Sequence, residues 1–293
     1  MNNFHFIAPP GKRLRLQDYD SSFTGKFEDE HQAAGKIQAD CQTLAELQDM
    51  LLAEETHALL LIFQAMDGSA KDGTIKYVMS NVDPQGAKAC NFKEPSREEL
   101  QHDYLWRFVK ELPARGQIGI FNRSYYEEVL VIRVHPEKLE AQHLPDRSSS
   151  NSARLAKNLW RARMTQINNF EHYLVENGIV ILKFFLHLSH EKQRERLLER
   201  ATLREKQWKF SISDVEERGF WDDYMKAYED MLQHTSTRHA PWHIIPADHR
   251  WFTQLAVADL IVAKLKALKL KYPTPNEQQQ QQLAQAKKQL ESG

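Results

Sequence analysis

Residues 59–74 read Leu-Leu-Leu-Ile-Phe-Gln-Ala-Met-Asp-Gly-Ser-Ala-Lys-Asp-Gly-Thr, and this stretch decides the fold. Its first five residues are apolar, as is typical of a buried strand. The chain then turns through small residues, and Ile75, Val78 and Met79 follow at helical spacing. The stretch therefore predicts a buried strand, a tight loop and a helix in direct succession.

The loop has the chemistry of a phosphate site, because the unpaired N–H groups at the start of a helix favour an anion. Lys71 stands where a P-loop lysine stands, but Ala70 before it and Asp72 after it depart from G-x-x-x-x-G-K-[ST]. On this pattern alone, an ordinary turn with an exposed lysine is an equal alternative. Asp67 favours phosphate binding, because a carboxylate at a strand end serves a Mg²⁺–phosphate complex and has no role in an ordinary turn.

The composition indicates an ordinary globular protein. The 293 residues are 41% hydrophobic and 27% charged, enough for one large core. The formal net charge is −1, so a site for a polyanion must come from local clustering of basic residues. Cys41 and Cys90 have neither disulfide-framework nor metal-ligand spacing, and we expect buried thiols in a reducing compartment. Without a signal-peptide pattern or a run approaching ~18 apolar residues, we expect a cytoplasmic protein with no membrane partner.

Strand and helix patterns alternate along the rest of the chain. Further strands are expected at 87–92, 117–121, 179–188 and 242–246, and the main helices at about 30–55, 96–112, 155–174, 191–204, 214–233 and 251–270. This alternation favours a parallel sheet with helices on both faces, because parallel neighbours require helical crossovers. Functional groups then collect at the carboxyl ends of the strands, where the loops after Phe63 and Phe121 both lie.

The chain divides into three parts. Residues 1–29 are mixed in character, and we expect an extended arm that lies on the domain. Residues 30–270 carry the strand and helix patterns and form the domain itself. Residues 271–293 contain a run of glutamines and form a polar tail, either frayed helix or disordered.

A second polar cluster, Asn122-Arg-Ser-Tyr-Tyr-Glu127, follows the third strand. An enzyme that transfers a phosphoryl group needs such a cluster to hold Mg²⁺ or to orient the acceptor. Asn122 is an amide and cannot be the usual anionic ligand, whereas Arg123 offers a bidentate fork for a phosphate. Glu127 or Glu128 is a candidate for the missing carboxylate. The alternative is that Glu127 simply pairs with Arg123 or Arg133.

Five motifs occur in order between about residues 30 and 270. They are Gln-Ala-Met-Asp-Gly-Ser-Ala-Lys-Asp-Gly-Thr at 64–74, Asp-Tyr-Leu-Trp-Arg at 103–107, Phe-Asn-Arg-Ser-Tyr-Tyr-Glu at 121–127, Trp-Lys-Phe at 208–210 and Ala-Pro-Trp at 240–242. Together they closely resemble the second family of polyphosphate kinases, which are polyphosphate:nucleotide phosphotransferases. The Phe-Asn-Arg-Ser spelling, with Asn122 where other branches carry Asp, is similar to the class III branch, whose members phosphorylate nucleoside monophosphates and diphosphates.

The resemblance implies a fold, an activity and partners. The fold is a three-layer α/β/α P-loop fold like that of thymidylate kinase, with a parallel sheet and a helical lid at about residues 136–212. The activity is reversible phosphoryl transfer between polyphosphate and AMP or ADP, or GMP or GDP. The implied cofactor is Mg²⁺ or Mn²⁺, the partners are polyphosphate and nucleoside mono- and diphosphates rather than nucleic acid, and the protein is expected to be a homo-oligomer.

The resemblance also implies roles for single residues. Asp67, Lys71 and Arg123 would be catalytic, and we expect Asp67 and Glu127 to be the metal ligands. Phosphates would contact the loop, Arg123 and two basic residues of the lid, that is Gly68, Ser69, Ala70, Lys71, Asp72, Gly73, Thr74, Arg123, Arg196 and Lys209. We expect the nucleotide to contact Asp103, Arg107, Asn122 and Arg133.

One departure from the family concerns Ala70, where the family usually has glycine. A methyl group there is tolerated only if φ is negative or the loop shifts slightly, so we expect altered phosphate affinity with activity retained. The basic runs at 154–163 and 192–204 are candidates for a polyphosphate groove with salt-dependent affinity. In the second run, however, interleaved glutamates at four-residue spacing are typical of a solvated helix with internal ion pairs.

Two rival functions stay open. An ATP-dependent nucleoside monophosphate kinase of the same fold would need an adenine pocket on the donor side, which the sequence neither shows nor excludes. A non-catalytic, nucleic-acid-binding P-loop protein would need a net basic domain with exposed stacking aromatic residues. The net charge near zero and the core spacing of most aromatic residues disfavour this second rival.

Overall fold

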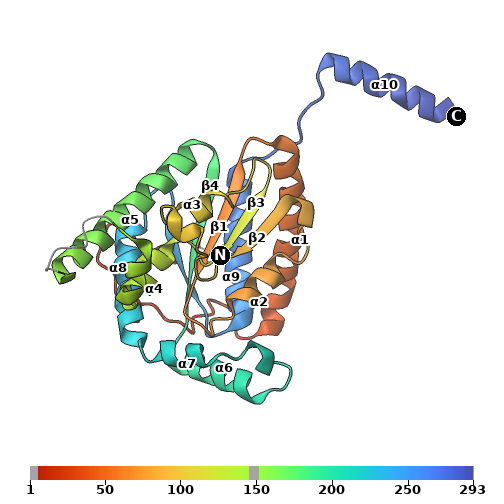
Figure 1. The fold of residues 1–293 in the computed structure, drawn as a ribbon. Helices are drawn as coiled ribbons and strands as arrows, with labels where there is room; N and C mark the ends of the chain where they lie inside the picture. The colour runs from red at the N-terminus through yellow and green to blue at the C-terminus, as the bar shows by residue number, and fades with distance from the viewer. Residues whose placement is uncertain (1–5, 145–151, 293) are drawn as a thin grey trace.

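The structure, a computed structural model, describes residues 6–144 and 152–292. Five strands form one parallel sheet in the order β2-β3-β1-β4-β5 (Figure 1). The strands are β1 (Ala58–Gln64), β2 (Ala87–Asn91), β3 (Ile118–Asn122), β4 (Ile179–His187) and β5 (Trp242–Pro246). Each strand lies where the sequence predicts one, so the α/β class with a parallel sheet is confirmed.

Strand β1 is central, with all seven of its residues buried. Its register pairs Phe63 with Asn122 of β3 and with Phe184 of β4. The loops that leave β1 and β3 therefore start at the same edge of the sheet, as expected for parallel strands.

Helices cover both faces of the sheet, which confirms the three layers. On one face lie α1 (Glu30–Glu54), α2 (Lys71–Val78) and α9 (Arg250–Ala267), and on the other lie α5 (Ser152–Glu176) and α8 (Trp221–Thr235) (Figure 1). Side chains of β4 alternate between the two cores, with Phe184 in the first and Phe185 in the second.

After β4 the chain forms α6 (His190–Thr202), η7 (Gln207–Lys209) and α7 (Ile212–Arg218), which lie beyond the carboxyl ends of the strands, at the bottom of Figure 1. We call His190–Arg218 the lid segment. The lid range of 136–212 expected from the sequence is too wide, because it includes the core strand β4 and α5, which packs on that strand. The composition change near residue 136 marks a turn within the domain body, where η6 (Pro136–Gln142) follows α4 (Val131–Val134).

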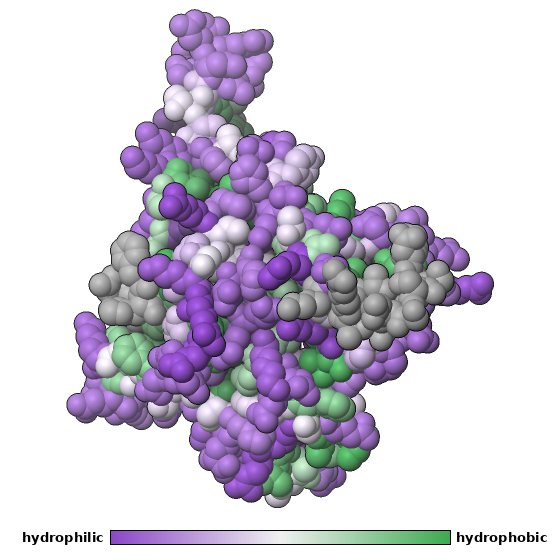
Figure 2. Space-filling model, turned by 90° about the vertical axis from the view of Figure 1, so that its left-hand side faces the viewer, coloured by the Kyte–Doolittle hydropathy of each residue, from purple (hydrophilic) through white to green (hydrophobic). Residues whose placement is uncertain are grey.

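The lid segment exposes six large apolar side chains. Figure 2 shows green patches at the lower end of the molecule, where this segment lies. Its exposed large apolar residues are Leu198, Leu203, Trp208, Phe210, Ile212 and Val215. These side chains gain nothing from the two cores of the domain.

Two of the expected helices differ from the sequence pattern. Ser96 and Glu99 form the reciprocal bonds of a capping box, at 2.6 and 3.3 Å, yet only η4 (Glu99–Gln101) follows before α3 (Trp106–Val109). The side chain of Asp103 accepts a hydrogen bond from the Leu105 amide at 2.9 Å, just before α3 begins. The helix expected at 214–233 divides into α7 and α8. The segment after β3 forms η5 (Tyr125–Val129) before α4.

The two ends of the chain differ. In the arm, Phe6, Ala8, Leu14 and Leu16 are buried, and the Leu16 amide donates to Glu229 of α8 at 2.7 Å. At the other end, α10 (Glu277–Ser292) projects from the body, and all its residues are exposed (Figure 1). In the part of the chain that the structure describes, no helix combines the length and apolar character needed to cross a membrane.

Candidate active site

A cleft of about 650 Å³ lies between the loop after β1 and the lid segment. Its lining includes eight basic side chains, Lys71, Lys93, Arg123, Arg196, Arg200, Lys206, Lys209 and Arg250. Four acidic side chains accompany them, Asp67, Asp72, Glu199 and Glu205. The basic side chains therefore outnumber the acidic ones in the cleft, although the net charge of the whole chain is −1. This locally positive region suits a polyanion. Arg200 belongs to the basic run at 192–204 that was a candidate for this groove. Lys93, Lys206 and Arg250 follow no pattern in the sequence, and only the fold brings them to the cleft.

The loop between β1 and α2 lines the cleft from Asp67 to Gly73. Ala70 is the N-cap of α2 and has φ 65° and ψ 26°, in the left-handed region. The methyl group of Ala70 was expected to be tolerated only if φ is negative or if the loop shifts slightly. The first condition is not met, because φ is positive. An alanine in this region costs roughly 1 kcal/mol relative to an ordinary conformation, so the loop keeps its shape at the expense of strain.

Lys71 lies at the start of α2 and is half-buried rather than exposed. Burial lowers the pKa of its amine, and the nearby charge of Arg123 lowers it further, against the opposing effect of Glu127, Asp67 and Asp72. The ammonium group is therefore under-compensated in the protein alone. A phosphate in the cleft would supply the missing negative charge. The lysine of an ordinary turn is exposed to water and needs no such partner.

Asp67 and Arg123 join the loop after β1 to the loop after β3. Nη2 of Arg123 lies 3.3 Å from Oδ1 of Asp67, and the Arg123 amide donates to the carbonyl of Phe63 at 3.1 Å. Arg123 has φ 65°, a second left-handed residue at this edge of the sheet. Burial acts to lower the pKa of Arg123, but the charges of Glu127 and Asp67 outweigh it, and the pKa is raised.

Asn122 is the last residue of β3 and lines the cleft. Its Nδ2 donates to Oδ1 of Asp72 at 2.6 Å. Its Oδ1 is buried and has no hydrogen-bond partner among the described residues. Buried acceptors are normally satisfied, so this oxygen is a candidate for a bond from a ligand.

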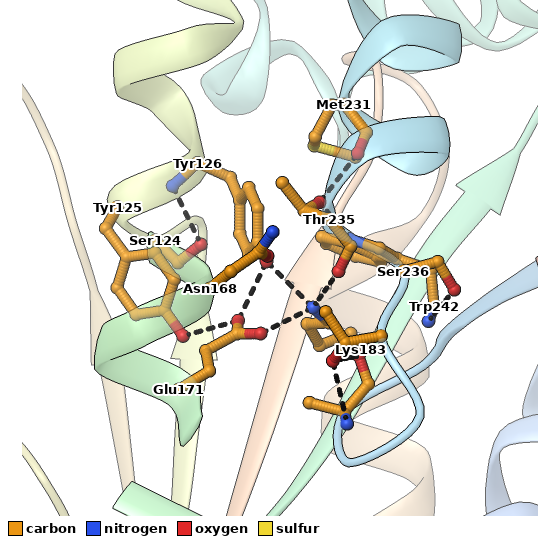
Figure 3. A network of polar contacts seen from close by, with 12 residues as sticks. Ser124, Tyr125, Tyr126, Asn168, Glu171, Lys183, Met231, Thr235, Ser236 and Trp242 are labelled. Carbon is orange, nitrogen blue, oxygen red and sulfur yellow. Dashed lines mark hydrogen bonds and ion pairs between the residues drawn. The ribbon is translucent and has the colours of Figure 1, made fainter. Parts of the chain in front are cut away.

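A buried network holds the segment that carries Arg123 (Figure 3). The hydroxyls of Tyr125 and Tyr126 donate to Oε1 of Glu171 on α5 at 2.9 and 2.8 Å. Nζ of Lys183 on β4 donates to Oε2 of Glu171 at 2.6 Å, to the Tyr126 hydroxyl at 2.8 Å and to the carbonyl of Thr235 at 2.7 Å. Burial lowers the pKa of Lys183 and raises those of both tyrosines. The network fixes the start of η5 against α5, β4 and α8.

Arg196 does not have the role expected of a side chain that closes over a ligand. It lines the cleft but is only 5% exposed, and its guanidinium donates to the carbonyls of Gly68, Ala247 and Asp248 at 3.1, 2.7 and 2.9 Å. Burial, together with the charge of Arg250, lowers the pKa of Arg196 to about 10. In this structure Arg196 holds the loop after β1 to the lid segment.

Other cations of the cleft are partly neutralised. Arg200 pairs with Asp214 of α7 at 2.8 Å, and Arg250 pairs with Glu199 at 2.9 Å. Lys209 is exposed, with its Nζ 4.9 Å from the centroid of the Trp208 ring. Lys209 therefore has the freedom to reach a ligand that Arg196 lacks.

Three of the four residues expected to contact the nucleotide lie outside the cleft lining, and only Asn122 is part of it. Arg107 pairs with Glu99 at 3.2 Å and donates to the Lys93 carbonyl at 2.9 Å. Asp103 caps Leu105, as described above. Arg133 pairs with Asp230 of α8 at 2.5 Å. The charges that suggested nucleotide contacts are thus engaged within the protein.

The two glutamates after β3 have different surroundings. Glu128 is buried in an ion pair with Arg163 at 2.7 Å and accepts from Gln142 at 2.8 Å. Glu127 is half-buried, and its charge acts on both Lys71 and Arg123. Since Arg133 pairs with Asp230, the alternative pairing of Glu127 with Arg133 does not occur.

A metal ion in this cleft would need oxygen ligands from the substrate in addition to those of the protein. Among the described residues, no three His, Cys, Asp or Glu side chains lie close enough together to hold one. Asp67 lines the cleft, whereas Glu127 is not among its lining residues, although the charges of both carboxylates act on Arg123. Mg²⁺ usually takes one or two carboxylates together with waters and substrate phosphates, so this donor set fits it.

The fold and the cleft define a P-loop-type phosphotransferase, with a strand-loop-helix phosphate site and basic side chains from a lid segment. The chain belongs to the polyphosphate kinase 2 (PPK2) family, whose model matches residues 26–274, and this confirms the resemblance seen in the motifs. It is 43% identical over 285 residues to an ADP-polyphosphate phosphotransferase of Rhodopseudomonas palustris, covering 97% of each chain. It is 40% identical over 271 residues to an AMP/ADP-polyphosphate phosphotransferase of Meiothermus ruber, covering 92% of this chain and 95% of the relative.

A solved structure agrees with this assignment. The crystal structure of polyphosphate kinase 2 from Arthrobacter aurescens TC1 matches with a TM-score of 0.81 and 36% identity. The match covers 92% of this chain and 94% of that one. The likeness therefore extends over most of the chain.

Proposed function

We propose that this protein is a polyphosphate-dependent nucleotide kinase, which transfers the terminal phosphoryl group of polyphosphate to a nucleoside mono- or diphosphate and back. The observation that supports it best is the convergence of Asp67, Lys71 and Arg123 from two neighbouring strand ends in one basic cleft. Polyphosphate carries roughly one charge per phosphate, and its binding should weaken with salt by counterion release.

The chain's own residues supply position and charge. A transferring phosphoryl group has a loose transition state with charge on its equatorial oxygens. Lys71 and Arg123, which line the cleft together with Asp67, are the cations that would stabilise this charge. For Arg123 to bind a phosphate, its 3.3 Å contact with Asp67 must loosen, which frees the carboxylate. Asp67 and Glu127 would then hold Mg²⁺, or Mn²⁺, which neutralises phosphate charge when bound. The acceptor is already anionic, so no nucleophilic serine or cysteine is needed.

We infer that both AMP and ADP are acceptors. One relative is named for ADP alone and the other for AMP and ADP. Asn122 in place of Asp supports the second alternative, by resemblance to the class III branch. GMP and GDP are further candidates.

Three other properties belong to this proposal. We infer a homo-oligomer, supported by the exposed Leu198, Ile212 and Val215 of the lid segment and by the projecting α10. Two free cysteines support a reducing, cytoplasmic location. We expect no nucleic acid as substrate. Sedimentation velocity of the full chain, with and without an oligonucleotide, tests the first and third of these statements.

The deciding experiment is ATP formation from AMP, polyphosphate and Mg²⁺ with no ATP added. We expect the wild type to form ADP and then ATP, and Lys71→Ala and Asp67→Asn to lose at least about 100-fold in turnover while staying folded. Lys76→Ala is the matched control, because Lys76 is exposed one turn further along α2. Phosphorylation of AMP only when ATP is supplied would replace this proposal with an ATP-dependent nucleotide kinase.

A further inference from the structure

Of the four residues expected to contact the nucleotide, only Asn122 lines the cleft, whereas Asp103, Arg107 and Arg133 lie outside it. A nucleotide whose phosphates meet the loop after β1 still needs a surface for its base. Proteins commonly hold bases by stacking them on aromatic rings. In the described part of the chain, the aromatic residues that line the cleft are Phe92 and Trp208.

Phe92 cannot serve as that surface. Its ring is 8% exposed and packs against Phe108 and Phe121, with centroids 4.5 and 4.9 Å away. The guanidinium carbon of Arg107 lies 5.4 Å from its centroid. Phe92 is a core residue whose edge reaches the cleft.

Trp208 has the opposite character. It is 77% exposed, whereas the other five tryptophans are buried or half-buried. Its Nε1 donates to the carbonyl of Glu205 at 3.0 Å, which orients the indole within η7. Because the apolar surface of this tryptophan is exposed to water, a ligand that covers the ring buries that surface and gains binding free energy.

We propose that Trp208 is the stacking surface for the nucleobase, an inference that rests on the proposed function. Polyphosphate has no apolar face, so it gains nothing from an indole, whereas a base does. Arg200, Lys206 and Lys209 of the lid segment also line the cleft. Lys209 is exposed and suits the phosphates attached to that base, whereas Arg200 and Lys206 would first have to leave Asp214 and Glu199. Stacking reads the face of a base rather than its edge, so adenine and guanine are accepted alike, and purines are preferred to the smaller pyrimidines.

The test is equilibrium binding of AMP, by calorimetry, to the wild type and three variants. Trp208→Ala should weaken AMP binding about 10- to 100-fold, and Trp208→Phe should stay within about threefold of the wild type. Phe210→Ala is the matched control, because Phe210 is a 41% exposed aromatic two residues further on that does not line the cleft. In steady-state kinetics, Trp208→Ala should raise the KM for AMP and leave the KM for polyphosphate unchanged.

Each outcome separates this inference from the proposed function. Unchanged AMP affinity in Trp208→Ala overturns the stacking surface, while ATP formation by the wild type would still support the kinase. A raised KM for polyphosphate alone, or a change in sedimentation coefficient, also overturns it and assigns Trp208 to the chain or to a subunit contact. AMP binding that depends on Trp208 in a protein without polyphosphate-dependent activity supports the stacking surface and refutes the kinase.

Discussion

Nε2 of Gln193 on α6 donates to the main-chain carbonyl of Asp67 at 2.9 Å. The other end of the same amide, Oε1, accepts from Nη1 of Arg218 at the end of α7 at 2.9 Å. Gln193 is 1% exposed, and a Cβ on Gly68 would lie 3.3 Å from its Cγ. One buried amide therefore connects the loop that carries Asp67 to both ends of the lid segment, and together with Arg196 it fixes the base of that segment.

Gln193→Met should lower kcat about 10- to 100-fold with a smaller change in KM. The substitution keeps the size of the side chain but removes both hydrogen bonds. The packing against the loop then remains, but the carbonyl of Asp67 is no longer fixed in direction. Small misplacements of reacting groups are costly for the rate. Gln38→Met on the exposed face of α1 is the control. The measurement is the split between kcat and KM in the ATP-forming assay. Normal turnover with a lowered Tm would assign Gln193 to stability alone.

The sequence was sufficient to predict the strands and the two polar loops, but not the contacts that hold those loops in place. All five strands and the two polar loops were predictable, because apolar runs and polar strand ends are local patterns. The role of Arg196 was not predictable. Its three acceptors are main-chain carbonyls, two of them about fifty residues further along the chain, and no spacing in the sequence encodes them.

The same limit explains the nucleotide contacts. Charged residues such as Arg133 and Arg107 suggest ligand contacts as long as their partners within the protein are unknown. Those partners lie in other parts of the fold: Arg133 pairs with Asp230, and Arg107 donates to the Lys93 carbonyl. The exposure of Trp208 was not predictable either. Its motif was recognised, but exposure is a property of the folded chain.

Ala70→Gly should raise the free energy of unfolding by about 0.5–1 kcal/mol, because glycine adopts φ 65° without the strain of a methyl group. The gain is smaller than the strain itself, since glycine loses more chain entropy on folding. Ala39→Gly, on an exposed position inside α1, is the matched control and should cost about 1 kcal/mol. Urea unfolding of both variants makes the comparison. Equal destabilisation by the two substitutions would show that Ala70 is unstrained.

Lys71→Met should abolish turnover and yet stabilise the ligand-free protein by about 0.5–2 kcal/mol, as happens when a site strained for function is relieved. The pKa of Lys71 is lowered by burial, so the folded state holds its proton less tightly than the unfolded chain does. The wild type should therefore gain stability as pH rises from the lowered pKa toward the ordinary value of 10.5, and Lys71→Met should lack that gain. Tm measured against pH, with Lys76→Met as control, decides the matter. A parallel pH profile for all three proteins would contradict it.

Lys183→Met should destabilise the protein by about 3–5 kcal/mol, because it leaves the carboxylate of Glu171 buried without its positive partner. Both side chains are fully buried, so water cannot replace the lost charge. The exposed pair of Lys226 and Asp223, at 72% and 61% exposure, is the control, and Lys226→Met should change stability by less than about 0.5 kcal/mol.

The double variant Lys183→Met, Glu171→Gln separates the ion pair from the rest of this network. An amide oxygen still accepts from the hydroxyls of Tyr125 and Tyr126 but needs no counter-charge, so the double variant should recover at least half of the stability lost in Lys183→Met. If it does, the tyrosines still anchor the segment after Arg123, and turnover should recover together with the free energy of unfolding, measured in the same urea series. Recovered stability without recovered turnover would mean that the charge of Lys183 acts on Arg123 by a route other than anchoring.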